Sequence, residues 1–280
     1  MPVKIFYSSD LHLEYQDPED ESSPFYIYSN PEMADIYRKS YLVLAGDICQ
    51  IYEKEKFQSF FDLITKKFKA IIYVTGNHEY HRVVYGDILI NQGVYPYGNV
   101  YFLQNDFIEF PEDNIRFYGT TLWSQLDPNP ENNKIAQKVG SDFKSIYNHD
   151  PLETSKSRYI TRNGTAKLFE KQFENLKFDL TSSNNLKTIV VTHHTPLIEI
   201  IQPWINLNEE KYKPLAYLYA SDIKLELEKL NFDYWIFGHS HSTYHHQLSL
   251  KNNKTAKFMS NPYGYFGSNK KFNSNCFIEI

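Results

Sequence analysis

The sequence is poor in cysteine and has no excess of basic residues, and each of these absences excludes a class of protein. Its 280 residues include two cysteines, Cys49 and Cys276, which are too few for a disulfide-stapled scaffold. The net charge is −5, whereas proteins that bind long nucleic acids gain most of their affinity from basic residues. We therefore do not expect long nucleic acid as the main partner.

Long apolar runs are also absent. No segment approaches the run of about 20 apolar residues that a membrane-spanning helix needs. The first residues, Met-Pro-Val-Lys-Ile-Phe-Tyr-Ser, lead directly into a predicted strand and lack the basic and apolar regions of a signal peptide. The sequence therefore predicts a soluble, cytoplasmic protein that does not enter a membrane.

The chain does contain enough apolar residues for a substantial core. Hydrophobic residues make up 41% of the sequence and aromatic residues 16%, so no disulfide or structural metal is needed to stabilise the fold. Short apolar runs alternate with longer amphipathic stretches, which is typical of an α/β protein with helices flanking a sheet. Because no internal repeat or Gly/Ser-rich linker divides the chain, we predict a single domain over residues 1–280.

The same patterns locate the secondary structure. Strands are predicted at Val3–Tyr7, Tyr41–Ala45, Ile71–Val74, Val100–Leu103, Ile115–Gly119, Thr188–Val191, Tyr234–Phe237, Tyr244–Leu248, Ala256–Met259 and Cys276–Glu279. Helices are predicted at Lys54–Phe68, Thr161–Phe178 and Ser221–Leu230. Irregular stretches near residues 14–39, 123–159 and 198–220 are interpreted as insertions over one edge of the domain.

Two details of the helices follow from their sequences. In the second helix, apolar residues at roughly helical spacing predict one buried face; they are Leu168, Phe169, Phe173, Leu176 and Phe178. Ser221 with Asp222 is the predicted N-cap of the third helix, because short polar side chains accept hydrogen bonds from the first free N–H groups of a helix.

Five short polar motifs each follow the end of a predicted strand. They are Asp10-Leu11-His12, Gly46-Asp47, Gly76-Asn77-His78-Glu79, Thr192-His193-His194 and Gly238-His239-Ser240-His241. In open α/β sheets ligands bind beyond the carboxyl ends of the strands, so these side chains are expected to share one site. Each motif alone is a weak signal, but five in order at strand ends are not plausibly independent accidents.

The residue types of these motifs are those of a metal site. Asp, Asn and His are ligands suited to Mn, Fe, Zn and similar divalent ions. Residues one position apart, as in Asp10-x-His12 and His239-x-His241, are expected to project to the same side of an extended segment. The glycines before Asp47, Asn77 and His239 are expected to let the backbone turn sharply and bring the ligand inward.

With these motifs the chain resembles the calcineurin-like metallophosphoesterases, whose motif order is Asp-x-His, Gly-Asp, Gly-Asn-His-(Asp/Glu), a strand ending in His, and Gly-His-x-His. The likeness spans residues 10 to 241 and implies a four-layer αββα sandwich of two mixed β-sheets flanked by helices. Closer likeness to bacterial and phage members lies in Gly119–Trp123, Val190–Pro196 and Asn261–Tyr265. In the last stretch Tyr263 stands where an arginine is expected, which puts phosphate binding by a cation at that position in doubt.

The resemblance implies a role for each site residue. It implies one metal held by Asp10, His12 and His241, a second held by Asn77, His193 and His239, and Asp47 as the catalytic carboxylate that bridges them. It implies that the catalytic residue His78 contacts the substrate phosphate and protonates the leaving oxygen, with Asn77 also near the substrate. Either His193 or His194 fits the fourth motif; we favour His193, which is nearer the strand end, and expect His194 to face the substrate.

The implied activity is hydrolysis of a phosphate ester by a hydroxide held on two divalent metal ions, without a covalent phosphoenzyme. The expected substrate is a small phosphomonoester or phosphodiester, with a nucleotide as one candidate. Aromatic residues of the insertions and termini are candidates for stacking on a base: Tyr26, Tyr28, Trp123, Trp204 and Tyr265. Basic residues that could meet substrate charge are Arg82, Lys270 and Lys271. The alternatives are a nuclease of the same superfamily and a partner-binding scaffold without activity, against which the complete ligand set argues.

Overall fold

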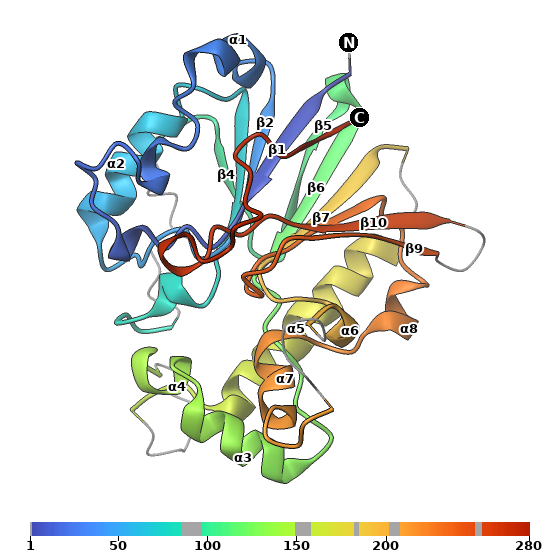
Figure 1. The fold of residues 1–280 in the computed structure, drawn as a ribbon. Coiled ribbons are helices and arrows are strands. Elements are labelled where there is room, and N and C mark those ends of the chain that lie inside the picture. The colour runs from blue at the N-terminus through green and yellow to red at the C-terminus, as the bar shows by residue number, and fades with distance from the viewer. Residues whose placement is uncertain (1, 86–96, 149–157, 182–184, 202–207, 250–253) are drawn as a thin grey trace.

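Two β-sheets lie face to face at the centre of the chain, with helices on their outer sides (Figure 1). The computed structural model describes residues 2–85, 97–148, 158–181, 185–201, 208–249 and 254–280. In the described part, the first sheet has the strand order β11-β1-β2-β3-β4 and the second the order β5-β6-β7-β8-β10-β9. This arrangement confirms the predicted αββα sandwich.

The strands have the following bounds. The first sheet contains β1 Lys4–Ser8, β2 Tyr41–Ala45, β3 Ala70–Val74, β4 Val100–Phe102 and β11 Phe277–Glu279. The second contains β5 Asp106–Phe110, β6 Ile115–Thr120, β7 Lys187–Thr192, β8 Tyr234–Ile236, β9 Tyr244–Ser249 and β10 Thr255–Ser260. Both sheets are mixed: strands β1 to β4 run parallel, as do β6, β7, β8 and β10, whereas β11, β5 and β9 pair antiparallel at the edges.

The helices have the bounds α1 Ala34–Tyr37, α2 Lys54–Ile64, α3 Pro130–Val139, α4 Asp142–Ser145, α5 Arg162–Thr181, α6 Ile198–Ile201, α7 Lys213–Tyr219 and α8 Lys224–Leu227. Helices α1 and α2 lie beside the first sheet, and α5, α6 and α8 beside the second (Figure 1). None of the described helices is long and apolar enough to cross a membrane.

The central parallel strands are buried on both faces, which explains why their sequences are continuous apolar runs. Every residue of β2 and of β3 is buried, as expected for parallel strands covered on both sides. Ile5, Val43 and Ile189 belong to a core cluster between the two sheets. Alternate residues such as Leu44, on the other face of β2, belong to the core cluster that also contains Phe61 of α2. Each layer is therefore stabilised by its own buried apolar contacts.

Every predicted strand is present, but some other predictions were wrong. Strand β5 was missed because it is an edge strand whose residues are mostly exposed. Helix α8 begins at Lys224, and Ser221 does not cap it: the Ser221 hydroxyl accepts a hydrogen bond from the backbone N–H of Gln125. Phe178 is 82% exposed, because the residue that follows Leu176 on the buried face, four positions on, is Leu180.

The predicted insertions supply the helices at the lower end of the molecule. The 123–159 stretch carries α3 and α4, and the 198–220 stretch carries α6 and α7. Helices α3 and α7 pack against each other there (Figure 1). The 14–39 stretch instead contributes α1 and short 3-10 turns beside the first sheet (Figure 1).

Candidate metal centre

All five polar motifs meet at one edge of the sandwich. They follow β1, β2, β3, β7 and β8, which are parallel strands of the two sheets. Because the carboxyl ends of parallel strands lie at the same edge of a sheet, loops separated by up to about 230 residues bring their side chains within hydrogen-bonding distance. The predicted convergence of the motifs is therefore present.

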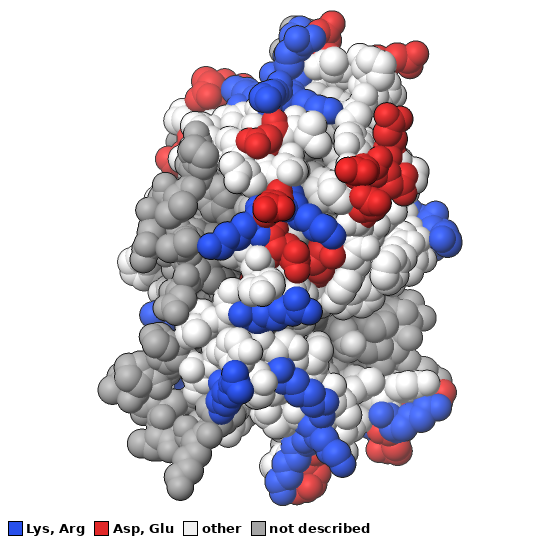
Figure 2. Space-filling view, turned by 90° about the vertical axis from the view of Figure 1, so that its left-hand side faces the viewer, with Lys and Arg blue, Asp and Glu red and all other residues white. Residues whose placement is uncertain are grey.

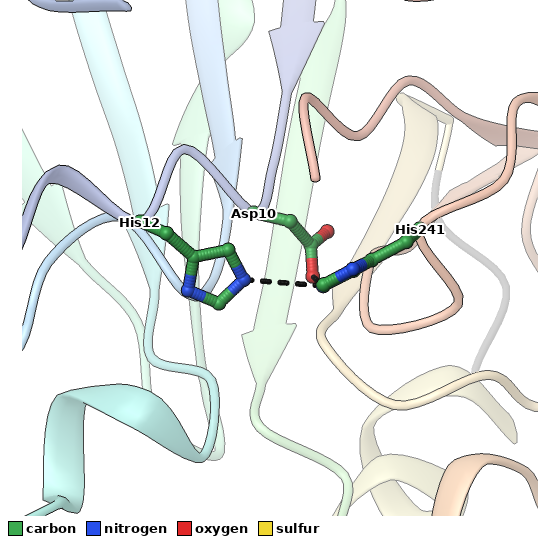
Figure 3. A group of neighbouring side chains, drawn as sticks. All are labelled: Asp10, His12 and His241. Carbon is green, nitrogen blue, oxygen red and sulfur yellow. Dashed lines mark hydrogen bonds and ion pairs between the residues drawn. The ribbon is translucent and has the colours of Figure 1, made fainter. Parts of the chain in front are cut away.

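The first cluster consists of Asp10, His12 and His241, whose polar atoms face one another (Figure 3). The Nε2 atoms of the two imidazoles are 3.1 Å apart, and Nε2 of His241 lies 3.2 Å from Oδ1 of Asp10. Asp10 and His12 are fully buried. These three side chains can hold one metal ion.

The second cluster consists of Asp47, Asn77, His193 and His239. The His193 Nε2 atom lies 3.1 Å from the Asn77 Oδ1 atom, 3.2 Å from the His239 Nδ1 atom and 3.3 Å from the Asp47 Oδ2 atom. The same Asp47 oxygen lies 3.9 Å from the His12 Nε2 atom of the first cluster. One carboxylate oxygen therefore faces both clusters.

Hydrogen bonds on the outer side of the second cluster fix which atoms face inward. The Nδ1 atom of His193 lies 2.9 Å from the carbonyl oxygen of Ala45, and Nε2 of His239 lies 3.2 Å from that of Leu218. A carbonyl oxygen can only accept, so these outer nitrogens carry protons, and the inward nitrogens are the ones that a metal ion can bind. Together with the Asp47 carboxylate, these inward atoms are the ligand types of a divalent metal site.

The negative charge of the carboxylates also favours a cation at the second cluster. Burial alone would lower the pKa of His193, but the Asp47 and Asp10 carboxylates raise it to about 10, so they favour a positive charge at the inward nitrogen, whether a proton or a metal ion that replaces it. The residues present therefore fit divalent metal ions at both clusters.

Five of these side chains project from backbone in the left-handed region. Asp10, His12, Asp47, His239 and His241 have φ values of 53°, 47°, 54°, 65° and 49°. Such conformations cost non-glycine residues of the order of 1–3 kcal/mol each and concentrate at functional sites. The expectation of extended segments was therefore wrong: the two histidines after β8 point to different clusters, His239 to the second and His241 to the first.

The glycines of the motifs serve two different purposes. Gly46 has φ +84°, so it makes the sharp turn that was expected. Gly238 has no positive φ, but a Cβ there would lie 2.7 Å from the Ala45 carbonyl oxygen and 2.8 Å from Oδ2 of Asp10. Its role is therefore close approach of the loop after β8 to the loops after β1 and β2.

His78 lies beside both clusters and is held at both of its nitrogens. Its Nδ1 atom lies 2.9 Å from Oε1 of Glu14, and its Nε2 atom lies 2.9 Å from the hydroxyl of Tyr265. Burial would lower the pKa of His78, but the charges of Asp47 and Glu14 raise it to about 9. A protonated imidazole at this position can donate a proton to a leaving oxygen.

Three acidic residues of the site were not among the predicted site residues. Glu14 also contacts Nδ1 of the His12 ring at 3.2 Å. Glu79 is fully buried, and its carboxylate accepts hydrogen bonds from the backbone N–H groups of residues 47, 48 and 76 and from the Tyr73 hydroxyl. Asp142 of α4 accepts a hydrogen bond from the Asn77 amide at 2.8 Å, which turns Oδ1 of that amide toward the cluster. Only Glu79 had a sequence signal, as the last residue of its motif.

His194 lies behind the second cluster. It is 1% exposed, and its ring packs against those of His239 and Trp123, with centroid distances of 4.3 and 5.1 Å. It is not among the described residues that line the cavity over the clusters. This placement gives no support to the substrate contact that was predicted for His194.

Most of the residues that were predicted to stack on a base are not placed at the metal centre. Tyr28 and Trp123 are 2% exposed and belong to the core, so their rings cannot stack on a ligand. Tyr26 is half-buried, with its hydroxyl bonded to the Pro18 carbonyl, and Trp204 lies outside the described residues. Tyr265 lies at the site, where its ring stacks on His12 at 4.3 Å.

The predicted basic residues lie away from the cavity. Arg82 is exposed and lies 3.8 Å from the carboxylate of Glu53. Lys270 and Lys271 are exposed, and neither these lysines nor Arg82 is among the described residues that line the cavity.

A cavity of about 540 Å³ opens over the two clusters. One side is formed by motif residues of both clusters together with His78 and Tyr265. The opposite side is formed by the junction of α3 with α4 and by α7. The lining residues of that opposite side are Val139, Gly140, Ser141, Asp142, Leu215, Leu218 and Tyr219. The loops after the strands therefore form one side of the cavity, and the predicted insertions form the other side.

Comparison with known proteins agrees with this geometry. An uncharacterised protein, L509, of Acanthamoeba polyphaga mimivirus is 28% identical over 300 residues, covering 98% of this chain and 95% of that protein. The crystal structure of phosphopantetheinyl hydrolase from Mycobacterium tuberculosis superposes with a TM-score of 0.67 at 16% identity, covering 100% of this chain and 96% of that one, and so shares the fold. The family model for calcineurin-like phosphoesterases matches residues 3–243. The chain therefore belongs to the calcineurin-like phosphoesterase family and is a metal-dependent phosphoesterase.

Proposed function

We propose that the chain is a single-domain, dinuclear hydrolase that cleaves a small phosphomonoester or phosphodiester. In this proposal Asp10, His12 and His241 hold one ion, Asn77, His193 and His239 hold the other, and Asp47 bridges them. The observation that carries the proposal is the position of Asp47 Oδ2, at 3.9 Å from His12 Nε2 and 3.3 Å from His193 Nε2. Mn, Fe and Zn all suit these ligands.

When bound, two such ions would lower the pKa of their water to near neutrality and clamp the phosphoryl oxygens of the substrate. The chain's own groups do the rest. The Asp47 carboxylate would offset the repulsion between two cations, and Asn77 and His78 would contact the phosphate. His78, kept protonated by Asp47 and Glu14, would give its Nε2 proton to the leaving oxygen, while the Tyr265 hydroxyl keeps that nitrogen facing the cavity.

The cavity suits a small molecule better than a long polymer. Its volume of about 540 Å³ lies within the range of small-ligand pockets, roughly 300–1,000 Å³. The described residues that line the cavity include no lysine or arginine, and the face drawn in Figure 2 carries both acidic and basic side chains, whereas binding of long nucleic acid needs a continuous basic surface. The structural neighbour named as a phosphopantetheinyl hydrolase supports ester hydrolysis on this fold. A mononucleotide stays among the candidate substrates, and a cytoplasmic location is part of the proposal.

Metal analysis combined with a generic activity assay tests the proposal. The purified protein should bind two divalent ions per chain and hydrolyse an aryl phosphate, and chelation should abolish the activity, with recovery when the metal is restored. Comparison of an aryl monoester with an aryl diester, followed by a panel of nucleotides that includes cyclic forms, assigns the ester class. A protein that binds a single ion, or that retains activity after complete metal removal, contradicts the proposal.

A further inference from the structure

The side of the cavity formed by α3 and α7, here called the α3–α7 wall, is lined largely by apolar side chains. The organic part of a substrate whose phosphate is at the metal centre would lie against this wall. In α7, Leu215, Leu218 and Tyr219 line the cavity and are only partly buried. Their spacing places them on one face of the helix. Leu215 and Tyr219 pack in part against the small cluster that contains Ala216 and Ala220, and Leu218 packs in part against the main core. The part of their apolar surface that stays exposed lines the cavity, and it gains stabilisation when an apolar ligand removes it from water.

The apolar surface continues from α7 to the end of α3. Val139 lines the cavity, and 49% of its surface is exposed. The neighbouring lining residues Gly140 and Ser141 are small and uncharged. The two helices therefore offer one continuous neutral surface to a ligand whose phosphate is at the metal centre.

The wall is fixed in position before any ligand binds. The buried guanidinium of Arg162, at the start of α5, donates hydrogen bonds to the carbonyl oxygens of Ser124 at 2.9 Å and Tyr217 at 3.0 Å. The Leu218 carbonyl accepts from the His239 ring. Helix α7 is thus tied both to the frame of the second sheet and to the metal centre, which gives the wall a defined distance from the reacting phosphate.

The described lining of the cavity contains no lysine or arginine, and its cationic side chain, His78, lies on the side of the metal centre. On the wall itself the single charged residue is Asp142, whose Oδ1 atom is held by Asn77 and His81 at 2.8 Å. A second phosphate or a carboxylate on the substrate that reached this side of the cavity would meet this anion, and no described lysine or arginine lines the cavity there to offset it. Unpaired negative charge brought close to a carboxylate is disfavoured.

We infer that the substrate is an ester with one phosphate group whose organic part is uncharged and largely apolar, held between the metal centre and the α3–α7 wall. This inference rests on the proposed function and narrows it. Nucleoside polyphosphates and esters with acidic tails are excluded by the charge of the wall. An alcohol with an aliphatic or aromatic body matches the surface that Val139, Leu215 and Leu218 present.

The test compares two aryl phosphates of similar leaving-group reactivity, one with a para tert-butyl group and one with a para carboxymethyl group, whose carboxylate is separated from the ring by a methylene. If the wild-type protein hydrolyses diesters better, methyl diesters of the same two phenols are used. We expect kcat/KM to be at least tenfold higher for the tert-butyl ester. Equal rates, or a preference for the carboxylate ester or for a nucleoside triphosphate, overturn the inference.

A matched pair of variants on α3 locates the effect. Val139→Lys brings a cation to the cavity rim and should reduce the preference for the neutral ester at least fivefold, mostly through KM. Ile135→Lys is the control, because Ile135 lies one turn earlier on the same helix, is 46% exposed and is not among the described lining residues. It should leave the preference unchanged. If both variants change it equally, the wall does not select the substrate.

Failure of the proposed function gives a different result. A protein that lacks bound metal, or that hydrolyses neither ester while its metal content is intact, refutes the proposed function itself. A protein that hydrolyses both esters with metal bound, but without discrimination between them, refutes only the inference about the wall.

Discussion

A single methyl group at Gly238 should disturb both halves of the metal centre. In Gly238→Ala the new Cβ would lie 2.7 Å from the Ala45 carbonyl oxygen and 2.8 Å from Oδ2 of Asp10. Ordinary contacts begin near 3.4 Å, so these atoms must separate by about 0.6–0.7 Å. Asp10 belongs to the first cluster, and the same Ala45 carbonyl orients His193 of the second.

The magnitude follows from the tolerance of metal sites. Ligand distances must usually hold within about 0.2 Å, and the required displacement is several times larger. Because loss of groups that orient ligands costs about 10–100-fold in metal affinity or activity, we expect a weakening of that size for each ion. Overpacking of a tight contact should also lower the free energy of unfolding by about 1–3 kcal/mol.

The assay is competition with a fluorescent chelator for Mn²⁺ or Zn²⁺, together with urea unfolding of the metal-free protein. Gly98→Ala is the matched control, since a Cβ there meets nothing within 4 Å among the described atoms and the residue has no positive φ. It should be neutral, or stabilising by up to about 1 kcal/mol through the unfolded chain. A Gly238→Ala protein that keeps metal affinity and activity within twofold of wild type refutes the reasoning from close approach.

Three further substitutions separate the roles of the polar groups. Asp47→Asn should lose most of the bound metal and the activity together, because an amide replaces the oxygen that faces both clusters; elemental analysis checks this, and full metal occupancy would contradict it. His78→Ala should keep both metals while kcat falls about 10²–10⁴-fold, the usual contribution of a general acid; a collapse in metal content would mean that His78 is a ligand. Glu14→Gln should lower kcat by about 10–100-fold. It should also move the basic limb of the pH–rate profile to lower pH, because the Glu14 charge helps to raise the pKa of His78. An unchanged profile would assign Glu14 a purely structural role.

The framework of the site could be predicted because it depends on local signals. Parallel buried strands read as continuous apolar runs, and a polar motif after each run marks the shared edge of the sheets. The convergence of the five motifs between Asp10 and His241 at one edge of the sheets could therefore be predicted from the sequence. The αββα arrangement itself came from the likeness of the motif order to a known family.

The remaining parts of the site depend on contacts that leave no local pattern. Asp142 meets Asn77 across 65 residues of sequence, and nothing near it distinguishes it from a helix-terminal acid on the surface. Glu14 follows a motif but reaches His78 only because the 3-10 turn Leu13–Tyr15 folds back over the site. The burial of Trp123 likewise depends on its packing against distant residues. The left-handed backbone at the ligand positions was not predicted: Asp and His adopt it more often than most other residues, but still only in a small fraction of cases.

The loop after β8 has a consequence for any attempt to retune the enzyme. It sends His239 to the second cluster and His241 to the first, while the Asp47 carboxylate faces both. A change designed to alter metal preference at one position will therefore propagate to its neighbour through the same short stretch of backbone. In the proposed dinuclear centre the two ions would therefore share one selectivity, and directed evolution toward a new metal would have to change both clusters together.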